Sequence, residues 1–406
     1  MIQWQSAEWL TAERLKIYPR LIFVLYVIGI ISWVMLATDN IDLKGRYLGA
    51  DFISFYAAGK LALQGHGALV YDVATHYQME LDIIGVQGFE MPFLSFSYPP
   101  TLLILLAPLS TLPYFYAFLV FQLSSLIFFI LMIKKLINCN EGIMLCLAFP
   151  AVFLTFCYGQ NALLSTGLMA GALFYIDRKP LLSGLLIGLL TFKPHLGVLI
   201  PLVLMLTGRW RVFLAASLTF VSLVLISSLA FGIEIWQGFW GGKELVKRIL
   251  HDELVPYSLM QSMFTGVRSM GTGIVIAYAL QALIASVSAV CVLWIWSCQV
   301  DMRLKIAAFA IGTLMISPYL LNYDLMILSI SIACLASYSL EFGFRHGLIN
   351  LLCLSWISPI IVRTLNSTIP FPWTPLLLSV ILYQILMITR RVNFNSNKLN
   401  TIEVLK

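Results

Sequence analysis

Asp51 is the acidic residue best placed to do chemistry in this chain. It lies in the segment 49–59, where small and aromatic residues follow the first long apolar stretch. A carboxylate in such surroundings can act as a general base that takes a proton from a hydroxyl group. The alternative is structural, because aspartate is also a favoured N-cap residue and a helix is predicted to begin near Phe52.

Lys193 is the cation whose position best complements such a carboxylate. It lies between two leucine-rich segments and is followed by Pro194 and His195. An ammonium group there can neutralise a phosphate that leaves as an anion. The alternative is a lysine that extends toward a membrane interface. His195 is either a second donor to the same phosphate or a helix-end histidine with an ordinary hydrogen bond.

Amides, tyrosines and a second acid occupy other turns between apolar stretches. Gln160 and Asn161 either bind sugar hydroxyls or satisfy the backbone of a turn. Tyr98, at the entry to the apolar segment 99–110, is a further candidate for contact with a sugar or an acceptor. Three consecutive residues either make the same kind of contact or begin the helix that follows them: Asn322, Tyr323 and Asp324.

Basic residues between 243 and 268 are candidates for binding anionic groups. Arg268, together with Lys247 and Arg248, either holds anionic headgroups or belongs to a solvated amphipathic face. The histidines show no metal-ligand spacing such as His-x-x-x-His. We therefore expect no metal site and no cofactor.

Composition predicts that a membrane surrounds the elements carrying these residues. Of 406 residues, 60% are hydrophobic and 11% are charged, and the mean hydropathy is +0.91. Soluble proteins carry about 25% charged residues. The net charge of +6 is not gathered into a stripe that would bind nucleic acid. The sequence predicts an all-α polytopic membrane protein with a single integral membrane domain, residues 1–406.

About twelve transmembrane helices are expected. Several are too short to cross alone, so they pair into hairpins whose polar tips are buried in protein or line a water-filled cavity. The segment 99–110 cannot cross a core of ~30 Å and is expected to be re-entrant or interfacial. In chain order the predicted spans are 20–37, 113–133, 142–158, 161–176, 181–192, 196–207, 212–231, 274–298, 306–318, 324–340, 347–363 and 375–389.

The distribution of basic residues predicts which ends of the spans face the cytoplasm. Lysine and arginine recur at alternate span ends, which places both termini and the tail 390–406 inside. Two long loops, 38–98 with Asp51 and 232–273, then lie outside. The three polar hairpin tips, residues 159–161, 193–195 and 321–324, lie on the same side. Within the second loop, 233–254 is predicted to form one amphipathic helix on the lipid headgroups.

Short motifs in a fixed order then match a known pattern. They are Ala50-Asp51-Phe52-x-x-Phe55-Tyr56-Ala57-Ala58, Gly65-x-Gly67-x-x-x-Tyr71, Tyr98-Pro99-Pro100, Ala107-Pro108-Leu109, Gly159-Gln160-Asn161, Lys193-Pro194, Gln261-Ser262-Met263-Phe264, and Ser317-Pro318 with Tyr323-Asp324. Over about residues 45–330 the chain resembles glycosyltransferase family 87, the polyprenol-phosphate-mannose-dependent α-mannosyltransferases of the GT-C superfold.

The resemblance implies a membrane enzyme that moves a hexose, mannose in that family, from a polyprenyl-phosphate donor to an extracytoplasmic glycolipid or glycan acceptor. It implies Asp51 as the catalytic base, and Lys193, with His195 and Arg268, as the ligands of the donor phosphate. In many relatives glutamine follows the Lys-Pro pair, so His195 is a departure. The implied location is the bacterial plasma membrane.

A transporter or flippase of lipid-linked saccharides is the main alternative. Alternating access needs polar residues in both halves of the membrane, whereas the predicted tips and long loops lie on one side. A polymerase or ligase that uses a lipid pyrophosphate would need a loop richer in arginine and histidine than 243–268. A scaffold is disfavoured by polar tips at membrane depth.

Overall fold

The computed structural model describes residues 9–86, 92–137 and 140–404. In these residues helices are joined by turns, and extended pairing is limited to isolated bridges such as the one between Met260 and Leu321. The all-α architecture predicted from the sequence is therefore confirmed for the described residues.

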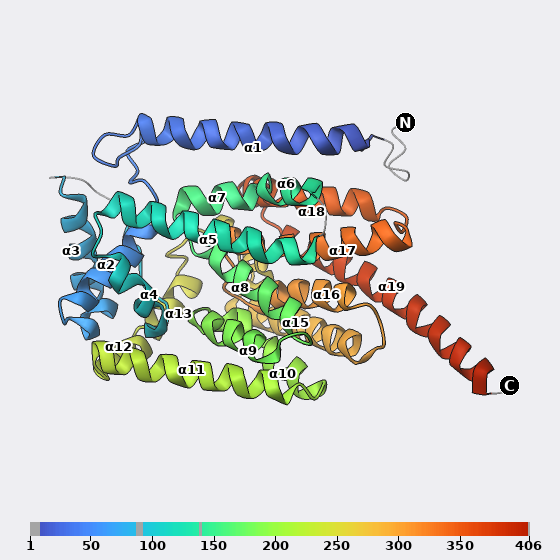
Figure 1. The fold of residues 1–406 in the computed structure, drawn as a ribbon. Coiled ribbons are helices and arrows are strands. Elements are labelled where there is room, and N and C mark those ends of the chain that lie inside the picture. The colour runs from blue at the N-terminus through green and yellow to red at the C-terminus, as the bar shows by residue number, and fades with distance from the viewer. Residues whose placement is uncertain (1–8, 87–91, 138–139, 405–406) are drawn as a thin grey trace.

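The helices lie roughly along one direction, so the molecule has two distinct ends (Figure 1). The first helix, α1 (Ala12–Met35), begins at the same end at which the last, α19 (Trp373–Val404), finishes. The opposite end, called here the loop end, carries short helices from both long loops and from the segment 99–110. These are α2 (Phe52–Leu63), α3 (Val73–Ile84), α4 (Leu103–Leu109) and α12 (Glu234–Gly241).

Seven helical stretches among the described residues are long and apolar enough to cross a membrane. A bent pair with an angle of 45° between its halves, α6 (Asn140–Leu147) and α7 (Pro150–Tyr158), is an eighth candidate. Five of the seven are whole helices: α1, α5 (Tyr114–Leu136), α11 (Trp210–Phe231), α15 (Ile274–Ser297) and α18 (Leu348–Thr368). The sixth, Asn322–Phe342, combines the 3₁₀ turn η6 (Asn322–Ile327) with α17 (Leu328–Phe342), and the seventh is the part Trp373–Asn393 of α19.

The other predicted spans correspond to shorter helices that pack between the long ones. Helix α8 (Ala162–Tyr175) packs on α5, α9 (Pro180–Leu189) on α8 and α11, and α16 (Met302–Ile316) on α15 and α17. The 3₁₀ turns η3 (Leu190–Phe192) and η4 (Pro194–Gly197) lead from α9 into α10 (Leu199–Leu206). Length and composition thus support seven or eight spans, and the count of about twelve is not confirmed.

Three boundary predictions are wrong. The first helix begins at Ala12 rather than residue 20, and α19 continues through the predicted tail to Val404. The predicted helix 233–254 is interrupted at Gly242, between α12 and α13 (Lys243–His251). Glycine is a poor helix former, and Gly241 and Gly242 are adjacent at this break.

The segment 99–110 folds as a 3₁₀ turn, η2 (Pro100–Leu102), followed by α4, which packs against α2 at the loop end. Helix α2 is buried along nearly its whole length by aromatic residues from neighbouring helices. The Phe52 ring lies 5.8 Å from that of Phe118 and 5.5 Å from that of Phe121, both on α5. This aromatic core fixes α2, and with it the residue just before α2, against the long helices.

Candidate active site

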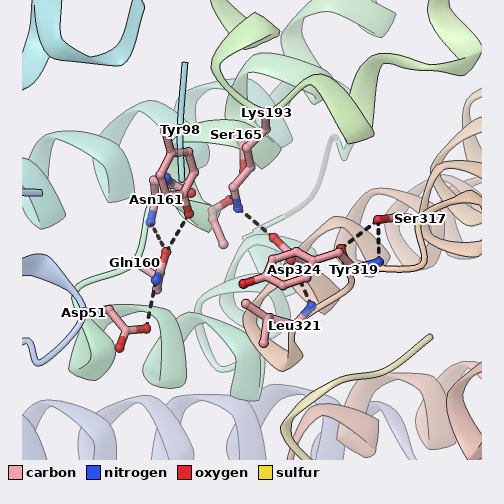
Figure 2. Close-up of polar contacts among 11 residues, drawn as sticks. Asp51, Tyr98, Gln160, Asn161, Ser165, Lys193, Ser317, Tyr319, Leu321 and Asp324 are labelled. Atoms are coloured by element: carbon pink, nitrogen blue, oxygen red, sulfur yellow. Dashed lines mark hydrogen bonds and ion pairs between the residues drawn. The ribbon is translucent and has the colours of Figure 1, made fainter. Parts of the chain in front are cut away.

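Asp51 immediately precedes α2, but its side chain does not cap that helix. Its backbone N–H donates to the Tyr158 carbonyl at 2.9 Å. Its carboxylate instead faces Gln160, whose Nε2 donates to Oδ2 at 2.8 Å (Figure 2). The N-cap position was predicted, but the capping role that would have explained the aspartate structurally is absent.

A glycine at the end of α7 makes this contact possible. Gly159 has a φ of +73°, and a Cβ there would lie 2.6 Å from Cβ of Phe52 and 3.1 Å from the carbonyl oxygen of Gly49. Only glycine combines this left-handed conformation with so close an approach. The turn after α7 therefore packs directly on the start of α2, which sets Gln160 opposite Asp51.

The Gln160 side chain joins Asp51 to a tyrosine. Its Oε1 accepts from the Tyr98 hydroxyl at 3.4 Å, while its backbone carbonyl accepts from Nε2 of Gln122 at 3.1 Å. An amide that donates to a carboxylate through nitrogen must accept from the hydroxyl through oxygen. The orientation of the amide is thus fixed by its two partners.

Burial changes the acid–base behaviour of Asp51. The low-polarity surroundings raise the pKa of its carboxyl group to about 6, and the hydrogen bond from Gln160 opposes that rise. A carboxylate with this pKa is mostly ionised at pH 7 and is a stronger base than an aspartate in water.

Lys193 and Asp324 form a buried ion pair on the other side of the site. The Lys193 Nζ lies 2.7 Å from Oδ1 of Asp324, and their side chains are 2% and 3% exposed. The second carboxylate oxygen accepts from the backbone N–H of Leu321 at 3.1 Å. Lys193 therefore does not extend toward an interface, and that interpretation is wrong.

Two tyrosines occupy the space between the two carboxylates. Burial, reinforced by Asp324 and Asp51, raises the pKa of both Tyr98 and Tyr319. Both hydroxyls stay protonated at neutral pH and can donate hydrogen bonds. The Tyr319 ring points its hydroxyl from the Asp324 side toward Gln160 and Asp51 (Figure 2).

The remaining predicted site residues make different contacts, some within this cluster and some outside it. Asn161 is fully buried beside Gln160, and its backbone N–H donates to Oε1 of Gln160 at 3.4 Å. Tyr323 presents its ring to the Lys193 ammonium, 5.3 Å from the ring centre. Asn322 donates to the Pro359 carbonyl at 2.9 Å, and Nε2 of His195 is buried without a hydrogen-bond partner among the described residues.

Arg268 is not joined to this cluster. It lies in α14 (Met263–Arg268), where its guanidinium donates to the Thr272 carbonyl at 2.6 Å and to the Tyr257 hydroxyl at 3.3 Å. No hydrogen bond or ion pair among the described residues connects it to Asp51 or Lys193.

Sequence reasoning missed Tyr319 and Arg363. Arg363 donates to the hydroxyl of Tyr158, the residue whose carbonyl accepts from the backbone N–H of Asp51. A signal existed for Arg363, because a lone arginine at the loop end of an apolar span runs against the cytoplasmic bias of basic residues. For Tyr319 the sequence carried no comparable signal.

Comparison with known proteins decides the family. The model of glycosyltransferase family 87 matches residues 96–318, more than half of the chain. The chain belongs to glycosyltransferase family 87. No curated protein and no solved structure matches it.

Family 87 membership makes this protein a membrane glycosyltransferase and decides against the transporter alternative. The matched range includes Tyr98, Gln160 and Lys193. Asp51 and Asp324 lie outside it, so their assignment to the site rests on the contacts described above.

Proposed function

We propose that the protein transfers a hexose, most simply mannose, from a polyprenyl-phosphate donor to a hydroxyl of an extracytoplasmic glycolipid or glycan. Asp51 acts as the general base of an inverting single displacement. The observation that carries the proposal is the Asp51 carboxylate, which is held by Gln160, raised in pKa to about 6 and not used as a helix cap.

One carboxylate is enough for this reaction. The acceptor oxygen attacks the anomeric carbon, its proton passes to Asp51, and the bond from that carbon to the phosphate oxygen breaks. A glycoside hydrolase of the same stereochemistry needs a second carboxyl group to protonate the leaving oxygen. A phosphate leaves as a stable anion, so it needs a cation and hydrogen-bond donors rather than an acid.

Lys193 is the proposed cation. An ammonium has three N–H groups, of which one is directed to Asp324, so two can reach a phosphate oxygen. Asp324 in this view positions Lys193. The buried Nε2 of His195 and the hydroxyls of Tyr98 and Tyr319 are further proposed donors to phosphate or sugar, and the reaction as written uses no metal or cofactor.

Arg268, Asn161, Asn322 and Tyr323 keep secondary roles in the proposal. Arg268 would bind phosphate only if its loop approaches Lys193 when the donor is present. Asn161, Asn322 and Tyr323 are proposed to shape the sugar and acceptor side of the site. Asn161 contacts Gln160 and Tyr323 contacts Lys193, whereas Asn322 donates to the Pro359 carbonyl.

Substitution of the base tests the proposal. Membranes containing the wild type or Asp51→Asn are incubated with labelled polyprenyl-phosphate mannose, and the labelled product is isolated. Losing a general base slows transfer by at least about 100-fold. Asp82→Asn is the matched control, because Asp82 is an exposed acid on α3 whose carboxylate accepts from Gln78.

Turnover of Asp51→Asn at the wild-type rate would remove Asp51 from the mechanism. Parallel incubations with polyprenyl-phosphate glucose and with a nucleotide sugar test the donor. Transfer from the nucleotide sugar alone would overturn the proposed donor class, whereas preference among the lipid-linked hexoses identifies the sugar.

A further inference from the structure

A cavity of about 330 Å³ lies between the two long loops, apart from the residues discussed so far. Its walls come from η1 (Gly67–Tyr71), the stretch before Tyr98, α12 and α13. Ligand sites typically begin at about 300 Å³, so the cavity is large enough for a headgroup or a sugar. Its principal lining residues are Tyr71, Phe96, Phe239, Lys243, Lys247 and Leu250.

The aromatic wall of the cavity is held rigidly between the loops. The Tyr71 ring lies 5.8 Å from the rings of both Phe96 and Phe239. Helix α12 packs closely on η1, because a Cβ on Gly238 would lie 3.0 Å from the Ala68 carbonyl oxygen and 3.1 Å from the Tyr71 ring. The wall therefore presents a fixed apolar surface.

Two lysines give the cavity a positive charge. Lys243 and Lys247 are one turn apart on α13, and the described lining contains no acidic residue. The Lys243 ammonium lies 3.3 Å from the centre of the Trp240 ring, and Lys247 makes only a loose pair of 3.7 Å with exposed Glu244. Neither charge is neutralised by a buried partner, so the cavity is suited to an anion.

The cavity is linked to the proposed active site by hydrogen bonds that run through Tyr98 and Gln160. The Tyr71 hydroxyl, in the cavity wall, donates to the Tyr98 carbonyl at 2.8 Å. The Tyr98 hydroxyl in turn contacts Gln160, the partner of Asp51. The anionic end of a molecule held in the cavity is thus separated from Asp51 by Tyr98 and Gln160, so a hydroxyl farther along that molecule would extend past these two residues to reach the carboxylate.

We propose that this cavity binds the acceptor and that the acceptor is an anionic lipid-linked molecule. Its anionic group meets Lys243 and Lys247, and its apolar part lies on Tyr71, Phe96 and Phe239. This inference rests on the proposed function, because it names the chemical class of the acceptor in that reaction. Exposed Trp240, beside Lys243, is a residue type that concentrates at the membrane–water interface, where such a lipid would enter.

Lipid binding to the purified protein tests the cavity without any transfer reaction. Native mass spectrometry measures binding of dihexanoyl phosphatidylglycerol, with dihexanoyl phosphatidylcholine as the zwitterionic comparison. We expect saturable binding of the anionic lipid and a loss of affinity of at least tenfold in Lys243→Gln/Lys247→Gln. Arg248→Gln is the control, because Arg248 lies on the same helix, does not line the cavity and pairs with exposed Asp252.

Three results would overturn the inference. These are equal binding of the zwitterionic lipid, unchanged affinity in the double variant, and full displacement of the lipid by equimolar inorganic phosphate, which would identify free phosphate as the ligand. Transfer assays separate this inference from the proposed function. The double variant should raise KM for the acceptor and leave KM for the donor unchanged. Selective lipid binding without any transfer from polyprenyl-phosphate sugars would contradict the proposed function and leave the cavity assignment standing.

Discussion

At the scale of single residues, the surroundings of Asp51 decide what its carboxylate can do. An aspartate in water has a pKa of about 3.9, so it is too weak a base to take a proton from a sugar hydroxyl efficiently. Burial raises that pKa to about 6, and Gln160 keeps the rise moderate by donating to the ionised form. The balance leaves Asp51 ionised at neutral pH with increased basicity.

The pH dependence of transfer follows from this balance. We expect kcat/KM to fall as the pH drops through about 6, because protonated Asp51 cannot act as a base. Gln160→Leu removes a hydrogen bond that stabilises the ionised form, so the midpoint should move to higher pH. Measurements of kcat/KM between pH 4.5 and 8.5 check both the wild-type midpoint and its shift in Gln160→Leu. Gln78→Leu is the control variant. A wild-type midpoint near 4, or the same midpoint in Gln160→Leu as in the wild type, would contradict the assignment of Asp51 as the base.

Candidate site residues could be predicted from the sequence where a residue type is unusual for its position. Asp51 before a helix and Lys193 at a polar hairpin tip were recognisable for this reason. The partnership of Lys193 with Asp324 was not, because the two lie 131 positions apart and no local pattern encodes their contact. Tyr319 was missed because a tyrosine after a proline is ordinary until the fold turns it toward Asp51.

At the scale of elements, short helices and 3₁₀ turns bring the polar tips together. The turn between η3 and η4 carries Lys193, and η6 carries Asp324, so their ion pair joins two polar segments inside the protein. Removing one partner of such a pair leaves an uncompensated buried charge, which costs about 3–5 kcal/mol. Replacing both with apolar residues is often nearly neutral.

A double-mutant cycle separates the structural role of Lys193 from its proposed role at the phosphate. We expect Lys193→Met to lower the free energy of unfolding by about 3–5 kcal/mol and Lys193→Met/Asp324→Leu to recover most of that loss. Transfer should be lost in both variants, because neither supplies the cation. Unfolding in mixed detergent and rates at saturating donor provide the two measurements.

Arg209→Met is the matched control for the cycle. Its bidentate pair with half-exposed Asp177 spans 2.8 Å and reaches water, so losing the arginine leaves no fully buried charge and should cost less than losing Lys193. Transfer by the stable double variant at the wild-type rate would confine Lys193 to a structural role and move the proposed phosphate site elsewhere.

Element boundaries were less predictable than element existence. The apolar stretches gave most helices, but 233–254 reads as continuous on one amphipathic face although Gly242 interrupts it. The segment 99–110 was recognised as too short to span, whereas its packing on α2 depends on contacts distant in sequence. Helices α8, α9, α10 and α16 are too short to count as spans by length, and the two that are largely buried, α8 and α16, pack against longer helices.

At the scale of the whole molecule, the site and the cavity share one end. Helices α2, α3, α4 and α12 gather at the loop end, opposite the start of α1 and the finish of α19 (Figure 1). The proposed lipid-linked donor and the proposed anionic acceptor would therefore meet at one end of the molecule. The proposed transfer needs this arrangement, because both substrates would have to reach Asp51 from the same side.

The orientation of that end in the membrane is the last prediction. The distribution of basic residues predicts that the loop end lies outside, so a cysteine there should react with an impermeant maleimide in intact cells. In an active variant without native cysteines, we expect Lys44→Cys to be labelled in intact cells. Arg178→Cys, equally exposed but between α8 and α9 at the opposite end, should be labelled only after permeabilisation. The reverse pattern would place Asp51 on the cytoplasmic side and exclude an extracytoplasmic acceptor.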